Sequence, residues 1–160
     1  MFKLLKIMSL SLLILTSACS KEEDKNVNVG GTEKLVIHSG DNQLDFSVEI
    51  ADNKEALYQG LRGRTSLASD SGLLFDISLV PSDMDVAMWM KDTLIPLDML
   101  FIDENGEIFF IHENAEPNST DAIYPPKRPR AVLEINAGTV ADLDIKVGDR
   151  IKNRLLGNME

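Results

Sequence analysis

The sequence predicts a mainly β fold, a compact β-sandwich or open barrel of short, mostly antiparallel strands with one or two short helices. Three observations predict it. Apolar and polar residues alternate over residues 43–51 with the period of two that is typical of a half-buried strand. Asn105-Gly106 separates two apolar runs, which is the strongest short hairpin signal. Strand-like runs outnumber helical ones, and short turns separate most of them.

The individual elements follow in order along the chain. Residues 34–39 and 43–51 predict a hairpin, and residues 52–63 predict a helix. In that helix Asp52 and Glu55 have the capping-box spacing, and Gly63 can end it. Residues 114–130 predict a long proline-bearing loop, and residues 137–145 a short helix or turn. The remaining strands are expected at 72–79, 86–90, 96–102, 107–113, 131–135 and within 146–155.

Composition and charge exclude some classes of function. The chain has 160 residues, 44% of them apolar and 26% charged, so it can bury a core without disulfides or metal. Its formal net charge is -10, and removal of residues 1–18 leaves 14 basic and 26 acidic residues, a net charge of -12. Such a surface repels phosphate backbones, so no nucleic acid is expected as a partner.

The N-terminal residues 1–18 predict a lipoprotein signal peptide. Lys3 and Lys6 precede a short apolar run, and small residues follow directly before Cys19, the only cysteine. This ending resembles a bacterial lipobox, which implies that Cys19 is acylated and anchors the protein to a membrane. The alternatives are an ordinary signal peptide with a chance cysteine, or an uncleaved anchor, for which the run is short.

Residues 19–32 predict the acylated cysteine followed by a flexible polar stalk, because they contain too little apolar surface to fold. Residues 33–160 are then expected to form a single β-rich domain. Ser20 after the cysteine fits sorting to the outer membrane. Residues 21–23 resemble tracts that carry some lipoproteins to the cell surface, although a plain solvated linker is the alternative. The expected location is therefore the bacterial cell envelope.

Charged residues inside apolar segments raise the question of a binding site. The segment 88–110 is strongly apolar yet contains Lys91 and Asp98. One interpretation is an internal network, with Arg64 holding Glu134 and Lys91 facing Asp98. Because buried pairs contribute little net stability, we favour a second interpretation, in which these charges rim one concave site. The candidate ligand-binding residues are Arg64, Trp89, Lys91, Asp98 and Tyr124, and the expected ligand is polar or saccharide-like.

Trp89 lies between Met88 and Met90, so strand spacing points its side chain away from both. Its indole either lies outward in a groove, where it can stack on a sugar ring or a cation, or packs under the long loop as a second apolar cluster. The basic residues Lys127, Arg128 and Arg130 either grip an anion or belong to a solvated loop.

Signatures of catalysis are few. No metal-ligand spacing, phosphate loop or nucleophile elbow occurs, so no metal and no cofactor are expected. Weak catalytic candidates are Asp98, Glu134 and His112, which would serve a carboxylate-dependent hydrolase acting on an envelope polymer. For His112 we favour the alternative of a satisfied histidine at the edge of the core. The main expectation is thus a small ligand-binding or accessory module, with a hydrolase or a module that binds another envelope protein as alternatives.

Six ordered motifs resemble a known family. They are GLRGR (60–64), GLLF (72–75), MWMKDTLIPLDMLFID (88–103), YPP (124–126), VLEINAG (132–138) and IKVGD (145–149). Together, over about residues 47–151, the chain resembles the bacterial and archaeal domain of unknown function 192. The resemblance implies a small, mainly β fold and no established activity. Departures from the family pattern are Leu73 for methionine, Met88 for an aromatic residue and Asp92 for asparagine.

Overall fold

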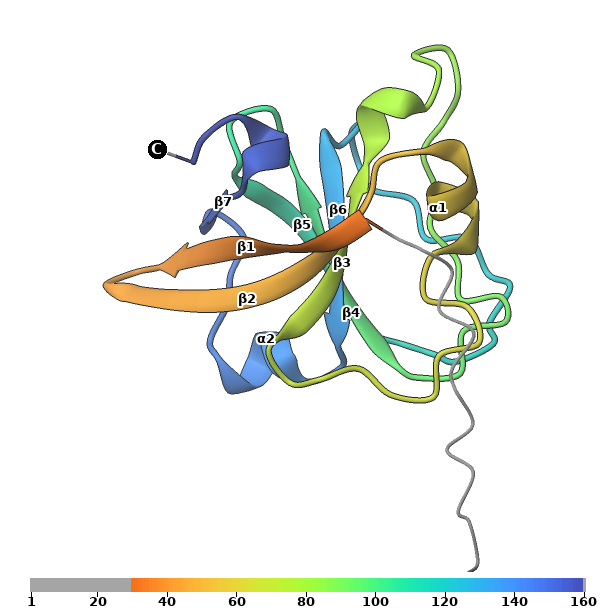
Figure 1. Ribbon diagram of the computed structural model, residues 1–160, viewed down its shortest axis with the longest axis horizontal. Helices are drawn as coiled ribbons and strands as arrows, with labels where there is room; N and C mark the ends of the chain where they lie inside the picture. Colours follow the sequence, from red (N-terminus) through yellow and green to blue (C-terminus); the bar gives the residue numbers. More distant parts are fainter. Residues whose placement is uncertain (1–29, 160) are drawn as a thin grey trace, which may run out of the picture.

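The computed structural model describes residues 30–159 (Figure 1). The predicted signal peptide, Cys19 and most of the predicted stalk lie outside the described residues. The elements are β1 (Gly30–Ser39), β2 (Asn42–Ala51), α1 (Lys54–Gln59), β3 (Ser71–Asp76), the 3-10 helix η1 (Ile77–Leu79), β4 (Leu97–Ile102), β5 (Ile108–Ala115), β6 (Ala131–Asn136), α2 (Thr139–Asp142), β7 (Arg150–Lys152) and the 3-10 helix η2 (Arg154–Leu156).

The seven strands form one curled sheet in the order β5-β4-β6-β3-β2-β1-β7. Every neighbouring pair is antiparallel except β2 and β3, which are parallel. The two edges of the sheet meet at one end, where the amide of Ile151 donates to the carbonyl of Gly106 over 2.7 Å. The mainly β prediction is confirmed, and of its two forms the structure adopts the open barrel.

Each face of the sheet carries its own apolar core. The first core fills the inside of the curl, and its largest members include Leu35, Ile37, Leu100 and Ile108. The alternation predicted for residues 43–51 supplies Phe46, Val48 and Ile50 to it. The second core lies on the outer face under α1 and the loops of residues 77–96 and 116–130, and its members include Leu61, Leu73, Phe75, Met90, Met99 and Phe101. This covered outer face positions the site described below.

α1 is shorter than the predicted helix and begins with a different cap. Asn53, and not Asp52, is the N-cap, and its side chain accepts a hydrogen bond from the amide of Ala56. The helix ends at Gln59 because Gly60 adopts a φ of 52°, in the left-handed region that glycine tolerates. An added Cβ at Gly60 would lie 3.4 Å from the ring of Phe75, in ordinary van der Waals contact, so the positive φ is what favours glycine here.

Two other boundaries differ from the prediction. Residues 86–90, expected as a strand, form only an isolated bridge between Met88 and Ile123. Their neighbour is the irregular loop 116–130, so no continuous ladder can form. Residues 30–32, assigned to the stalk, form the start of β1, where a register shift before Glu33 lets Gly30 pair with Ile50.

No helix within residues 30–159 is long and apolar enough to span a bilayer.

Candidate functional site

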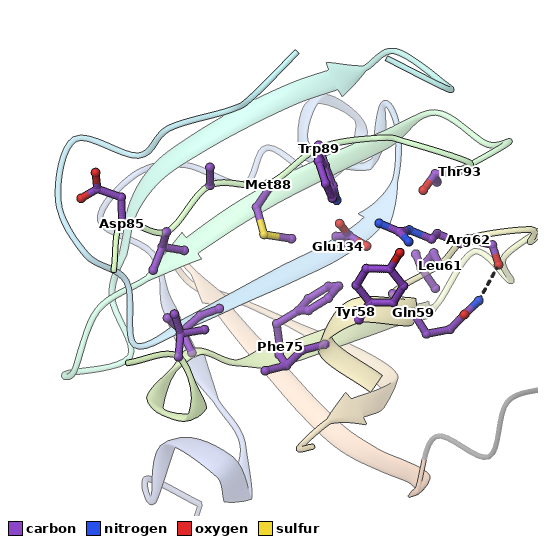
Figure 2. Close-up of a pocket in the computed structure, with 16 residues that line it drawn as sticks. Tyr58, Gln59, Leu61, Arg62, Phe75, Asp85, Met88, Trp89, Thr93 and Glu134 are labelled. Carbon is purple, nitrogen blue, oxygen red and sulfur yellow. Dashed lines mark hydrogen bonds between the residues drawn. The ribbon is translucent and has the colours of Figure 1, made fainter. Parts of the chain in front are cut away.

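A cavity of about 170 Å³ opens on the covered outer face of the sheet, between the end of α1 and residues 85–93 (Figure 2). Its wall combines apolar side chains with a few polar ones, as is typical of small-molecule sites. The lining residues are Leu57, Tyr58, Gln59, Gly60, Leu61, Arg62, Phe75, Ile77, Val80, Asp85, Val86, Ala87, Met88, Trp89, Thr93 and Glu134.

Glu134 supplies the most unusual group of this cavity. It lies on β6 and is only 4% exposed, with Leu73 of β3 and Met99 of β4 as its cross-strand neighbours. Among residues 30–159 no cation lies within ion-pair distance of its carboxyl group. Burial among apolar neighbours raises the pKa of Glu134 to about 8, because the charged form loses its hydration. At neutral pH the cavity therefore contains a largely protonated carboxyl group.

Three side chains form the mouth of the cavity. The guanidinium carbon of Arg62 lies 4.2 Å from the ring centroid of Tyr58 and 5.6 Å from that of Trp89. Figure 2 shows the two rings on either side of the Arg62 guanidinium. Tyr58 comes from α1, and the left-handed turns at Gly60 and Gly63 direct Arg62 back towards it. These contacts are cation–π interactions that leave the edge N–H groups of Arg62 free to bind.

Trp89 is 49% exposed, so it lies outward at the cavity mouth and not within the second core. Met90 is buried, and Met88 is partly buried against the same core. The side chains thus alternate as expected from the sequence, even though residues 86–90 form no strand. Of the two interpretations offered for Trp89, the structure shows the groove.

Asp98 has an architectural position instead of a place in the cavity. It is fully buried, and its two carboxyl oxygens accept the amides of Asn114 over 2.9 Å and Val140 over 3.0 Å. Val140 belongs to the first turn of α2, whose N-cap Gly138 offers no side chain, so Asp98 replaces the missing cap. The predicted pair of Asp98 with Lys91 is wrong, because α2 and the β5 bulge at Asn114 occupy both carboxyl oxygens.

Arg64 and Lys91 also lie apart from the cavity lining. Arg64 donates two hydrogen bonds of 2.6 Å each to the carboxylate of Glu49, so its predicted pairing with Glu134 is wrong. Both partners are about one-fifth exposed, and β2 holds Glu49 beside the turn that carries Arg64. Lys91 is exposed. Asp92 adopts a φ of 60°, a left-handed conformation that Asp and Asn tolerate.

Tyr124 lines a separate depression, together with residues 82–86 and 125–128. Arg128, at the edge of this depression, donates to the carbonyls of Val80 and Met84 over 2.6 and 2.9 Å. Arg130 pairs with Asp76 at 2.5 Å. Acceptors within the protein thus already engage Arg128 and Arg130. Few of their N–H groups remain available for the anion that the sequence suggested as a ligand.

The carboxylate pair required by the hydrolase hypothesis does not form. Asp98 is in register with Ile135, and Glu134 with Met99, so the two carboxyl groups point to opposite faces of the sheet. His112 is the other cross-strand neighbour of Met99, which places it two strands from Glu134 and outside the cavity lining. The described part of the chain also holds no cluster of three or more potential metal ligands.

The structure therefore brings together two of the residues proposed from the sequence, Trp89 and Glu134. Sequence reasoning missed Tyr58 and Arg62. A signal for them existed, since Arg62 lies in the GLRGR motif four residues after Tyr58, a spacing that places side chains on one helical face. The neighbouring Arg64 of the same motif was chosen instead.

Comparison with known proteins agrees with this architecture. The chain belongs to the DUF192 family, described as "Uncharacterized ACR", whose model matches residues 35–153. A solved structure from Sinorhizobium meliloti 1021, described as a proposed transcription regulator, has a TM-score of 0.73 and 40% identity, covering 78% of this chain and 95% of that one. A protein of unknown function from Novosphingobium aromaticivorans DSM 12444 has a TM-score of 0.71 and 29% identity, covering 76% and 85%. No curated protein matches the chain.

Proposed function

We propose that this protein is a lipid-anchored lipoprotein of the bacterial envelope whose β-rich domain binds a small ligand in the cavity between α1 and residues 85–93. The observation that carries the binding proposal is Glu134, a carboxyl group buried at the cavity with no partner among the described residues. No fully buried side-chain oxygen or nitrogen among the described residues lacks a partner, so the oxygens of Glu134 are open to the cavity, where a ligand can reach them.

The remainder of the cavity supports the same proposal. Leu61, Phe75 and Met88 supply apolar walls, and Tyr58 and Trp89 supply aromatic rings at the mouth. Such rings stack on sugar faces, alkyl chains or cations. A polar floor below aromatic walls fits a ligand with both polar and apolar parts.

The description of the S. meliloti protein as a transcription regulator suggests nucleic acid as a partner. For this chain we propose otherwise, because its formal net charge is -10 and its candidate site is a small cavity instead of a basic surface.

Ligand binding is expected to depend on Trp89 and not on Tyr124. The full-length protein in detergent micelles would be screened by thermal shift against a chemically diverse panel of sugars, organic acids, amines and amino acids. A ligand at one hundred times its Kd stabilises the native state by about 2.7 kcal/mol. Trp89→Ala removes one wall of the cavity and should abolish the shift, whereas Tyr124→Ala changes a different depression and should retain it.

Both side chains are about half exposed or more, so neither substitution is expected to unfold the domain. A shift of equal size in Trp89→Ala would place the ligand elsewhere. A flat response of the wild type across the panel would contradict small-ligand binding and favour the alternative of an envelope protein as partner.

Membrane attachment is expected to depend on Cys19. Multiple acyl chains anchor a protein stably, because each buried methylene contributes about 0.8 kcal/mol. In bacteria, Cys19→Ser should move the protein from the membrane fraction to the soluble fraction and abolish labelling by an alkyne fatty acid. Retention of the variant in the membrane would instead indicate an uncleaved anchor.

A further inference from the structure

We propose that the ligand is a small zwitterion of the amino acid class, with its ammonium group directed to Glu134 and its carboxylate directed to Arg62. This inference rests on the proposed function, since it assigns a ligand class to the same cavity. Two groups without partners in one cavity carry it: the ionisable carboxyl group of Glu134 at the floor and the guanidinium of Arg62, which has no counter-ion, at the mouth.

Glu134 differs from the other buried acids of the described chain. Asp76 is 8% exposed and pairs with Arg130, and Asp98 is fully buried with two backbone amides as donors. These two acids show how the fold satisfies a buried carboxyl group. Glu134, at 4% exposed, receives no such donor from residues 30–159, so the fold leaves it available to a ligand that donates.

Arg62 differs in the same way from the other arginines. Within residues 30–159, each of the others either donates a hydrogen bond, as Arg64 does to Glu49 and Arg128 to Val80, or forms an ion pair, as Arg150 does with Glu107. Arg62 instead stacks on Tyr58 and Trp89. Stacking holds the guanidinium plane while its N–H edge remains free, which suits a bidentate contact with a carboxylate.

The two groups do not neutralise each other in the structure, because no nitrogen of Arg62 lies within 4.0 Å of the Glu134 carboxylate. A ligand with only an ammonium or only a carboxylate would engage one of the two groups and leave the other without a partner. An amine alone would meet the positive charge of Arg62 at the mouth, and a carboxylate alone would leave the carboxyl group of Glu134 without a cationic partner. A molecule that carries both charges matches both groups.

The groups around Glu134 determine how its ionisation responds to a ligand and what size of ligand fits. Tyr58 and Arg62 face the cavity from α1 and the turn after it, and Asp85 from the loop before Trp89. The adjacent strands contribute the apolar Leu73 and Met99. An incoming ammonium therefore stabilises the ionised form of Glu134, and the proton of the carboxyl group passes to the buffer. The small cavity volume favours short side chains.

The test uses three-carbon compounds that carry an ammonium group, a carboxylate or both. The fluorescence of Trp89, the only tryptophan, is titrated with β-alanine and alanine and with the single-charge analogues propylamine and propionate. At least one zwitterion should bind about tenfold or more tightly than either analogue, as expected for a charge-assisted contact. Calorimetry in buffers of different ionisation enthalpy should show release of nearly one proton per ligand at pH 7.

Matched variants assign the two contacts. Glu134→Gln should weaken zwitterion binding about tenfold or more and remove the proton release. Arg62→Gln should weaken zwitterion binding without removing the proton release. Arg64→Gln, two residues away and paired with Glu49 outside the cavity, should change neither.

Equal affinity for propylamine or propionate, or unchanged binding in Glu134→Gln, would overturn the zwitterion assignment. So would the absence of zwitterion binding at millimolar concentration. The broader panel with Trp89→Ala decides separately whether the cavity binds any small ligand, so the two proposals fail by different results.

Discussion

Replacing Asp98 by asparagine should lower the free energy of unfolding by about 3 kcal/mol, because a buried amide then loses its acceptor. Asp98 accepts from Asn114 and Val140 with different oxygens, and asparagine turns one of these oxygens into a donor. The unmatched N–H group then faces another donor at a position that is 0% exposed. Either the β5 bulge at Asn114 or the first turn of α2 at Val140 therefore loses its hydrogen bond to residue 98.

In urea unfolding, this loss should lower the urea concentration at the midpoint of the transition. The slope of the unfolding free energy against urea concentration should stay the same. Asp103→Asn is the matched control, because Asp103 also accepts two backbone amides, those of Asn105 and Glu107, but in a hairpin near the surface. There both amides donate to one oxygen, Oδ1, which asparagine retains, so a smaller change is expected. Wild-type stability in Asp98→Asn would contradict the architectural role and reopen a functional one.

Glu134 should make the wild type less stable as the pH rises from 5 to 9. Its pKa is raised in the folded protein from 4.5 to about 8, so the folded state binds the proton more tightly than the unfolded state. The stability that depends on the protonated group is complete below pH 4.5 and is lost as the pH rises through about 8. The pKa difference of 8 − 4.5 at 1.36 kcal/mol per unit limits the loss to about 5 kcal/mol.

Urea unfolding of wild type and Glu134→Gln at pH 5, 7 and 9 isolates this contribution, because the other titrating groups are common to both proteins. The wild type should lose several kcal/mol relative to the variant between pH 5 and pH 9. Glu134→Met, which also removes the cost of burying the carboxyl group, should be more stable than wild type at pH 9. Parallel pH profiles for wild type and Glu134→Gln would show that Glu134 has a partner or is hydrated.

Local patterns predicted the sheet well and the site poorly, for physical reasons. The period of two in β2 and the Asn105-Gly106 turn act over a few residues, so both are visible in the sequence. Residues 86–90 carry the same strand pattern, yet they form a single bridge because their neighbour, the loop 116–130, is irregular. Strand pairing depends on the partner as well as on the pattern.

The charged residues show this limit more sharply. The opposite charges of Lys91 and Asp98 suggested that they face each other, but Val140, 42 positions after Asp98, supplies one of its donors. Alternation along β6 places Glu134 on the face opposite Asp98, which becomes evident only once the register of β4 and β6 is known. Arg62 and Arg64 share one motif, and the turns at Gly60 and Gly63 decide which of them reaches the cavity.

The position of β7 has a consequence for how the protein folds. β7 lies near the C-terminus, yet it pairs with β1, and the segment that leads into it bonds to the start of β5. Contacts of such high sequence separation give a large contact order, and we expect folding on the millisecond to second scale. The sheet cannot close until β7 has been synthesised. If the chain is exported, as proposed above, this delay would be an advantage. The sheet remains incomplete during export, so the chain stays unfolded until export has ended.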